Sequence, residues 1–158
     1  MKKTIAILGD AGGDFPNGIS ILMEQDLRLL FVSENGAQKK SIRESLAHQG
    51  AAELDFTSCE REGCWEADLI MMLNQETPSA SLVARIKEVA TQKVVINAFE
   101  GTKPATANSL IELFPWSKVA EIALHPAQKE IEVYSSDTEA RAAVQSLFAA
   151  SGYEIKYN

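Results

Sequence analysis

The chain has 158 residues, of which 46% are hydrophobic and 23% charged, an ordinary composition for one globular domain. Its 15 Lys and Arg against 22 Asp and Glu give a net charge of −7, which disfavours binding to nucleic acid. No apolar run reaches the ~20 residues of a membrane span, and the first short run meets Gly9 and Asp10 instead of a signal-peptide cleavage site. We therefore expect a cytoplasmic protein whose partners include neither nucleic acid nor membrane.

Short apolar runs alternate with helical patterns along the chain. Continuous apolar runs predict buried strands over residues 4–8, 27–32, 52–57, 68–73, 94–96, 119–124, 131–134 and 154–157. Apolar residues at helical spacing predict helices after the first strand and over residues 38–48, 78–90, 106–114 and 140–148. Strands separated by helices favour right-handed crossovers. They predict an α/β fold in which residues 1–158 form one three-layer, doubly wound, mostly parallel sheet with helices on both faces.

Capping residues predict where two of these helices begin. Thr77 is a suitable cap, and Pro78 suits the first helical position because its missing N–H would be unpaired there. Ser136 and Glu139 have the spacing of a capping box.

Two cysteines and two tryptophans are expected to have structural roles only. Cys59 and Cys64 have four residues between them in a charged segment that we expect to be a loop, and a zinc site would need further ligands. We expect free thiols there and no metal. Trp65 and Trp116 are expected to be packing residues.

The turn after the first strand is the first candidate ligand site. In doubly wound sheets, ligands bind beyond the carboxyl ends of the strands, where the strand order reverses. A dinucleotide needs glycines there and a helix N-terminus to hold its pyrophosphate. The candidate residues are Gly9, Asp10, Ala11, Gly12 and Gly13. The G-x-G-x-x-G spacing from Gly9 would require glycine at positions 11 and 14, where the chain has Ala11 and Asp14, so the fingerprint is degenerate.

Two starts of the following helix remain open. Asn17 as cap leaves a long loop and a helix of only about two turns. Asp14 as cap gives a helix of normal length but puts a carboxylate in the anion site, close to Asp10. Each solvated carboxylate would repel a pyrophosphate by about 1 kcal/mol. A tight glycine turn with an ordinary Asp cap is therefore the alternative to a nucleotide site.

The end of the second strand supplies Ser33 and Glu34. An acid at this distance from the first glycine can accept hydrogen bonds from a ribose diol, and it would repel the 2′-phosphate of NADP. Lys39 and Lys40 would offset that repulsion if their helix directs them back toward the site. No P-loop lysine follows the glycines, which disfavours nucleoside-triphosphate chemistry.

His125 follows the sixth predicted strand and is expected at the ligand-bearing edge of the sheet. Histidine is a common general base because it titrates near neutrality. The alternative is an ordinary loop histidine, and the sequence names no partner for it.

The order of these segments resembles the NADP-binding (Rossmann) domain of the deazaflavin-coenzyme-dependent NADP reductases and the related pyrroline-carboxylate-reductase-like oxidoreductases. The matching segments are residues 3–9, 66–70, 93–98, 113–119 and 137–144, followed by Gly152 and Tyr153. The resemblance spans nearly the whole chain and implies the Rossmann fold.

The resemblance also implies a set of cofactor contacts. Gly9 and Gly12 correspond to the pyrophosphate turn, Ser33 to the ribose or phosphate contact, and Asn74 and Ala98 to the cleft wall. The chain departs from the family where Glu34 replaces an arginine and Asn74 replaces a hydrophobic-proline turn, and no second helical domain is expected after Asn158.

The sequence thus predicts a single NAD(P)-binding domain of oxidoreductase type with a small-molecule nucleotide as partner. The choice between NAD and NADP stays open, as does the question of whether the chain is an enzyme. A ligand-sensing or interaction module that kept the scaffold and lost the cofactor is the alternative. A third hypothesis is a homodimer in which a second subunit completes the site.

Overall fold

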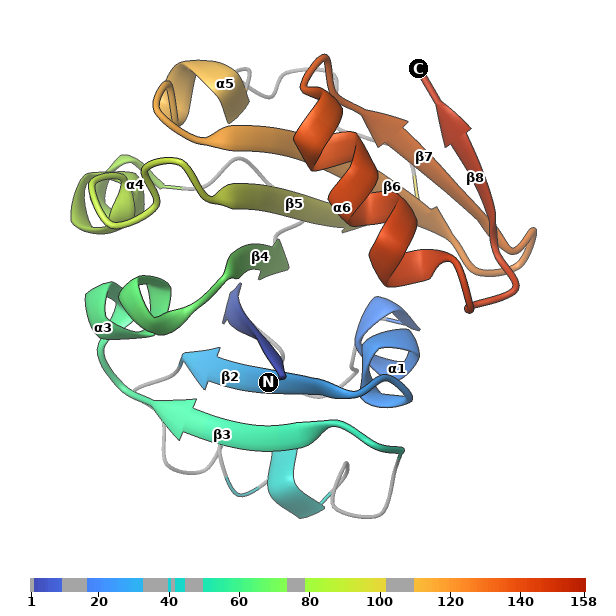
Figure 1. The fold of residues 1–158 in the computed structure, drawn as a ribbon, viewed down its shortest axis with the longest axis horizontal. Helices are drawn as coiled ribbons and strands as arrows, with labels where there is room; N and C mark the ends of the chain where they lie inside the picture. The colour runs from blue at the N-terminus through green and yellow to red at the C-terminus, as the bar shows by residue number, and fades with distance from the viewer. Residues whose placement is uncertain are drawn as a thin grey trace.

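The computed structural model describes residues 2–9, 17–32, 40, 42–44, 50–73, 79–101 and 110–158. In this part of the chain, eight strands form one sheet with the order β3-β2-β1-β4-β5-β6-β7-β8 (Figure 1). Neighbouring strands are parallel except β6 and β7, which are antiparallel. The predicted α/β class and the mostly parallel sheet are confirmed.

All eight predicted strands are present. They are β1 (Lys3–Gly9), β2 (Leu27–Val32), β3 (Glu53–Thr57), β4 (Leu69–Leu73), β5 (Val94–Glu100), β6 (Lys118–His125), β7 (Glu130–Tyr134) and β8 (Glu154–Tyr157). The prediction ended β5 too early because Asn97 interrupts its apolar run. In the structure Asn97 is only 1% exposed, and the strand continues through it to Glu100.

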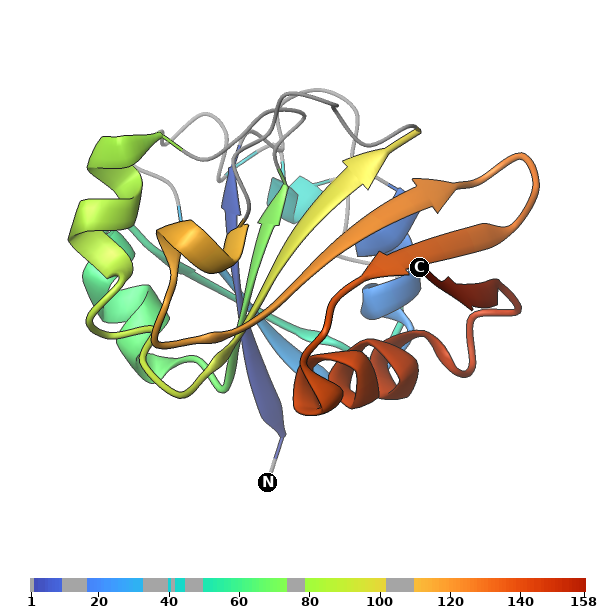
Figure 2. The same cartoon turned by 90° about the horizontal axis from the view of Figure 1, so that it is seen from above.

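Helices cover both faces of the sheet. The described helices are α1 (Asn17–Met23), α3 (Glu60–Glu66), α4 (Ala80–Ile86), α5 (Leu110–Leu113) and α6 (Thr138–Phe148). Figure 2 shows α3, α4 and α5 on one face and α1 and α6 on the other. Each face has its own core, because alternate strand residues point to opposite sides. The α1/α6 core includes Ile19, Phe31, Ile96, Val144 and Phe148, and the α3/α4/α5 core includes Ile70, Met72, Ile86, Val95 and Phe114.

The segment with the two cysteines is a helix, so the prediction of a charged loop was wrong. Its acidic residues Glu60 and Glu62 lie in the first turn of α3, where negative charge is favourable. Cys64 is fully buried against the sheet, and burial raises the pKa of its thiol to about 12. Cys59 precedes the helix and is exposed; both are free thiols.

The predicted packing role of the two tryptophans was also wrong. Trp65 is 72% exposed and Trp116 is 52% exposed. A lysine ammonium lies over each ring, Lys93 at 5.9 Å from the Trp65 centroid and Lys87 at 5.3 Å from that of Trp116. The indole rings thus make cation–π contacts at the surface and do not pack in the core.

The caps of two helices differ from the predicted residues. Ser79 caps α4 by accepting a hydrogen bond from the backbone N–H of Leu82, two residues after the predicted cap Thr77, which lies outside the described residues. Asp137, and not Ser136, caps α6 by accepting from the N–H of Ala140 at 2.9 Å. A carboxylate combines an acceptor with a charge that the positive helix end favours, which explains why Asp137 takes the position.

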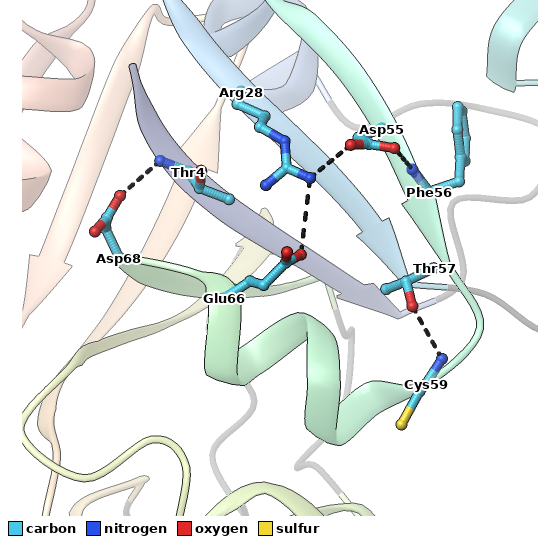
Figure 3. A network of polar contacts seen from close by, with 8 residues as sticks. All are labelled: Thr4, Arg28, Asp55, Phe56, Thr57, Cys59, Glu66 and Asp68. Atoms are coloured by element: carbon cyan, nitrogen blue, oxygen red, sulfur yellow. Dashed lines mark hydrogen bonds and ion pairs between the residues drawn. The ribbon is translucent and has the colours of Figure 1, made fainter. Parts of the chain in front are cut away.

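An ion-pair network ties α3 to the amino-terminal half of the sheet (Figure 3). Arg28 on β2 lies 2.5 Å from the Asp55 carboxylate on β3 and 3.7 Å from that of Glu66 at the end of α3. Asp68, just before β4, accepts a hydrogen bond from the Thr4 N–H on β1 at 2.8 Å. These contacts lie away from the carboxyl edge where a ligand is expected, so they are structural.

Candidate functional site

The order of the strands reverses at the centre of the sheet. From β1 the chain moves outward to β2 and β3 and then returns to β4 on the other side of β1. The carboxyl ends of β1, β4 and β5 point to the same edge of the sheet (Figure 2). Such a reversal separates the two connections that leave β1 and β4, and it is where doubly wound sheets bind ligands.

Gly9 and Ala98, two of the predicted site residues, lie in one row at this edge. Gly9 on β1 pairs with Leu73 on β4, and Leu73 pairs with Ala98 on β5. With strands about 4.8 Å apart, the Gly9 and Ala98 backbones are separated by about 10 Å. Ala98 is 6% exposed and its side chain packs in the α1/α6 core.

The backbone of Gly9 takes a conformation that requires glycine. Its φ is +113°, and it is exposed at the end of the strand. A side chain at this φ would clash with the backbone, so only glycine adopts it without strain. Position 9, where β1 ends, therefore requires glycine.

The other predicted cofactor contacts lie outside the described residues. They are Asp10, Ala11, Gly12, Gly13, Ser33, Glu34 and Asn74. In the described part of the chain, β2 ends at Val32 and β4 at Leu73, the residues before Ser33 and Asn74 in the sequence. The structure describes α1 from Asn17 onward, and the choice between the two predicted helix starts stays a prediction.

His125 at the end of β6 has a carboxylate partner. Its Nε2 lies 2.7 Å from Oε1 of Glu132 on β7. The two strands form an antiparallel hairpin around residues 126–129, in which His125 pairs with Glu130. The side chains of His125 and Glu132 are 21% and 30% exposed. The pair thus combines a fixed geometry with access from solvent, as a proton-transfer group needs.

Two further donors hold the same carboxylate. The Tyr134 hydroxyl donates to Oε2 of Glu132 at 2.6 Å, and Nδ2 of Asn158 donates to that oxygen at 3.1 Å. The bonds from Tyr134 and His125 lower the pKa of Glu132, so it is an anion at neutral pH. The bond between Tyr134 and Glu132 also raises the pKa of Tyr134 to about 12, because a phenolate would face the negative carboxylate.

The sequence predicted the place of His125 but not its partner. Glu132 is seven residues further along the chain, and the sequence alone does not show how many of the residues between them form the turn. The signal that was available is the alternation in β7, where Glu130, Glu132 and Tyr134 share one face opposite Ile131 and Val133.

A pocket of about 320 Å³ lies on the same face of the sheet as this network. Its wall includes Leu110 and Ile111 of α5, Glu121 of β6, and both Tyr134 and Asn158. Glu121 is 7% exposed and lies four residues before His125 on the same strand. The pocket is therefore beside the histidine–carboxylate network and away from Gly9.

Within the described residues, no group of three or more His, Cys, Asp or Glu side chains is placed to hold a metal ion. None of the helices in this same part of the chain has the length and hydropathy of a membrane span.

Comparison with sequences finds no relatives, since no protein-family model and no curated protein matches the chain. Comparison with solved structures finds many. The chain superposes on 5-formyl-3-hydroxy-2-methylpyridine 4-carboxylic acid 5-dehydrogenase, an NAD⁺-dependent dismutase, with a TM-score of 0.69 and 16% identity. That match covers 99% of this chain and 57% of the dehydrogenase, so the chain spans little more than half of that protein.

Two other structural neighbours belong to the families that the sequence resembles. A protein from Arthrobacter sp. FB24, assigned as an NADP reductase that depends on a deazaflavin coenzyme, matches with a TM-score of 0.61 and 14% identity, over 99% of this chain and 84% of its own. Pyrroline-5-carboxylate reductase from Coxiella burnetii matches with a TM-score of 0.61 and 13% identity, over 99% of this chain and 58% of its own. At this identity the likeness shows the fold, and the predicted Rossmann-type architecture is confirmed.

Proposed function

We propose that this chain is a nicotinamide-dinucleotide-binding domain of oxidoreductase type, which holds NAD or NADP across the carboxyl edge of its sheet. The observation that carries the proposal is Gly9 with φ +113° at the end of β1, beside the reversal of strand order between β1 and β4. The pyrophosphate would lie against residues 9–13, because a glycine turn lets backbone N–H groups approach a phosphate closely.

The remaining contacts of the dinucleotide follow from the positions of the strand ends. Ser33 and Glu34, which follow β2 in the sequence, would contact a ribose, and Asn74, which follows β4, would line the nicotinamide side. Ala98, two residues before the end of β5 and buried in the α1/α6 core, would support that wall from below. The NAD⁺-dependent dehydrogenase and the NADP reductase named above support both cofactors as candidates. Glu34 would repel the 2′-phosphate of NADP, so NAD and NADP are compared directly in the test below.

The histidine–carboxylate pair suits the proton transfer that accompanies hydride transfer. The cofactor supplies the hydride chemistry, and the protein supplies orientation and proton handling. His125 is the last residue of β6, which is the second strand from β4 on the side away from β1. Glu132 fixes its ring. We assign His125 the role of general acid or base toward a bound substrate.

Calorimetry with NAD, NADP and their reduced forms tests the cofactor assignment. We expect saturable binding at or below millimolar concentration. Gly9→Ala should weaken it at least about fivefold, since a side chain at this φ strains the backbone by about 1 kcal/mol or more. Gly152→Ala is the matched control: Gly152 also has a positive φ, +81°, but lies in open space far along the chain. It should bind as the natural chain does. If none of the four nucleotides binds, the proposal fails and the ligand-sensing module replaces it.

A second variant tests whether the glycine-rich turn is the binding element. Asp14→Gly removes one carboxylate from the region of the helix N-terminus, so affinity for the dinucleotide should rise if acidic residues repel the pyrophosphate. Unchanged affinity would mean that this turn is not the site. Sedimentation at micromolar concentration tests the homodimer hypothesis, and a monomer throughout would remove it.

A further inference from the structure

The two oxygens of the Glu132 carboxylate have separate partners. Oε1 contacts His125 Nε2, whereas Oε2 accepts from the Tyr134 hydroxyl and from Asn158 Nδ2. Tyr134 lies two residues further along β7, on the same face, and Asn158 follows β8, which is parallel to β7. The carboxylate is therefore held from three directions by β6, β7 and the residue after β8.

This arrangement decides which nitrogen of His125 carries the proton. An ionised carboxylate can only accept hydrogen bonds, so the Nε2 that faces it must be the N–H of the neutral ring. The lone pair is then on Nδ1. A carboxylate held through one oxygen alone can rotate about its terminal torsion, which is broad for Glu. The donors on Oε2 restrict this rotation.

We propose that Tyr134 and Asn158 are positioning residues, which hold the Glu132 carboxylate so that Oε1 fixes the His125 ring with Nδ1 as its basic nitrogen. The use of Nδ1 in proton transfer rests on the function proposed above. The hydrogen-bond arrangement itself is independent of any cofactor.

The neighbouring charges are compatible with this role. On β7, Glu130 pairs with Lys156 of β8 at 2.8 Å, so that ammonium is engaged beside the network. Glu154 on β8 pairs with Glu130 in the strand register, and Glu121 on β6 pairs with Tyr134. The described groups around the network are thus mainly acidic, and Tyr134 and Asn158 supply its neutral donors.

Nitrogen-15 NMR of the His125 ring tests the proposal without a cofactor. In the natural chain we expect the ring proton on Nε2 and slow exchange of that proton with water. His125→Gln assigns its signals, because the chain has only two histidines. Tyr134→Phe keeps the aromatic ring and removes one donor on Oε2, so the Glu132 carboxylate should rotate more freely. Exchange of the Nε2 proton should then become faster, by up to the roughly tenfold expected if the His125–Glu132 bond were lost altogether.

Tyr157→Phe is the matched control. The Tyr157 hydroxyl donates to Gln145 Oε1 at 2.7 Å and makes no described contact with Glu132, so its removal should leave the His125 signals unchanged. Asn158→Ala is the second test variant and does not depend on the folding of Tyr134→Phe. It should accelerate exchange by a smaller factor, because its bond to Oε2 is longer.

The outcomes separate the two proposals. A ring proton on Nδ1, or exchange in both test variants equal to that in the natural chain, would overturn the positioning role. If the NMR results are as expected but no nicotinamide nucleotide binds, the positioning role stands and the proposed function fails. If both hold, Tyr134→Phe should lower kcat once a substrate is known, while the cofactor Kd stays the same.

Discussion

Asp55 shows how a single partly exposed carboxylate contributes to stability. The Arg28 guanidinium and the Phe56 N–H hold the pKa of Asp55 below its ordinary value. Because the folded pKa is lower than the unfolded one, the stabilisation is complete above the unfolded value of about 3.9 and is lost as pH falls through the folded value. Asp55→Asn should therefore reduce the free energy of unfolding at pH 7, by no more than about 1 kcal/mol because the side chain is 48% exposed.

Urea unfolding at a series of pH values measures this effect. The difference between Asp55→Asn and the natural chain should shrink below about pH 3.9 and vanish once Asp55 is protonated in the folded state. Asp26→Asn is the control, since Asp26 pairs with Lys2 at 3.2 Å but is 78% exposed. A difference for Asp55→Asn that stays constant down to low pH would contradict this account.

Helix α3 can pack closely on the sheet because Gly63 has no side chain. A Cβ there would lie 2.7 Å from Cγ2 of Val32 and 3.1 Å from Cγ2 of Thr57. Both neighbours are β-branched and stiff, so they cannot move aside easily. Gly63→Ala should destabilise the protein by about 1–3 kcal/mol, although alanine alone would favour a helix by about 1 kcal/mol.

A double-mutant cycle with Val32→Ala isolates this contact. Val32→Ala removes the methyl group that the new Cβ would meet, so the double variant should lose less stability than the sum of the two single variants. Urea unfolding gives all three values. Stabilisation by Gly63→Ala alone would show that the helix can shift and that close approach is not what requires glycine.

The same helix shows where prediction from sequence stops at the level of elements. Continuous apolar runs predict the strands because residues buried on both faces leave no alternation. Helix α3 was missed because it has seven residues, of which only Gly63 and Cys64 are buried, so it carries no apolar stripe. The pairing of His125 with Glu132 depends on the length of the turn between β6 and β7. The residues of this turn show no periodicity, so the sequence does not give its length. The requirement for glycine at position 9, by contrast, was predictable because it is local.

At the scale of the whole molecule, the described residues form two cores that share one sheet. Strands β1 and β4 are central and contribute residues to both cores, whereas β3 and β8 are edge strands with one neighbour each. Opening a central strand exposes both cores at once, so its amide protons should exchange only through global unfolding. Protons of β8, whose residues are mostly exposed, should exchange through local opening with a lower free energy.

Native-state hydrogen exchange at increasing urea concentration checks this gradient. The amides of β1, β4 and β5 should converge on one free energy and one urea dependence, equal to those of global unfolding. Protection in β8 equal to that in β1 would contradict the gradient. Two distinct limits for the two cores would contradict their cooperative unfolding.

The histidine and its carboxylate partner belong to one short hairpin, residues 118–134, more than a hundred residues after the turn at Gly9. The geometry of the pair is set by the register of two adjacent strands, and nothing in that register involves the first turn. Mutations can therefore remove either the glycine fingerprint or the histidine–carboxylate pair and leave the other intact. A homologue with an intact glycine fingerprint and no histidine, or the reverse, would be the expected result of this independence.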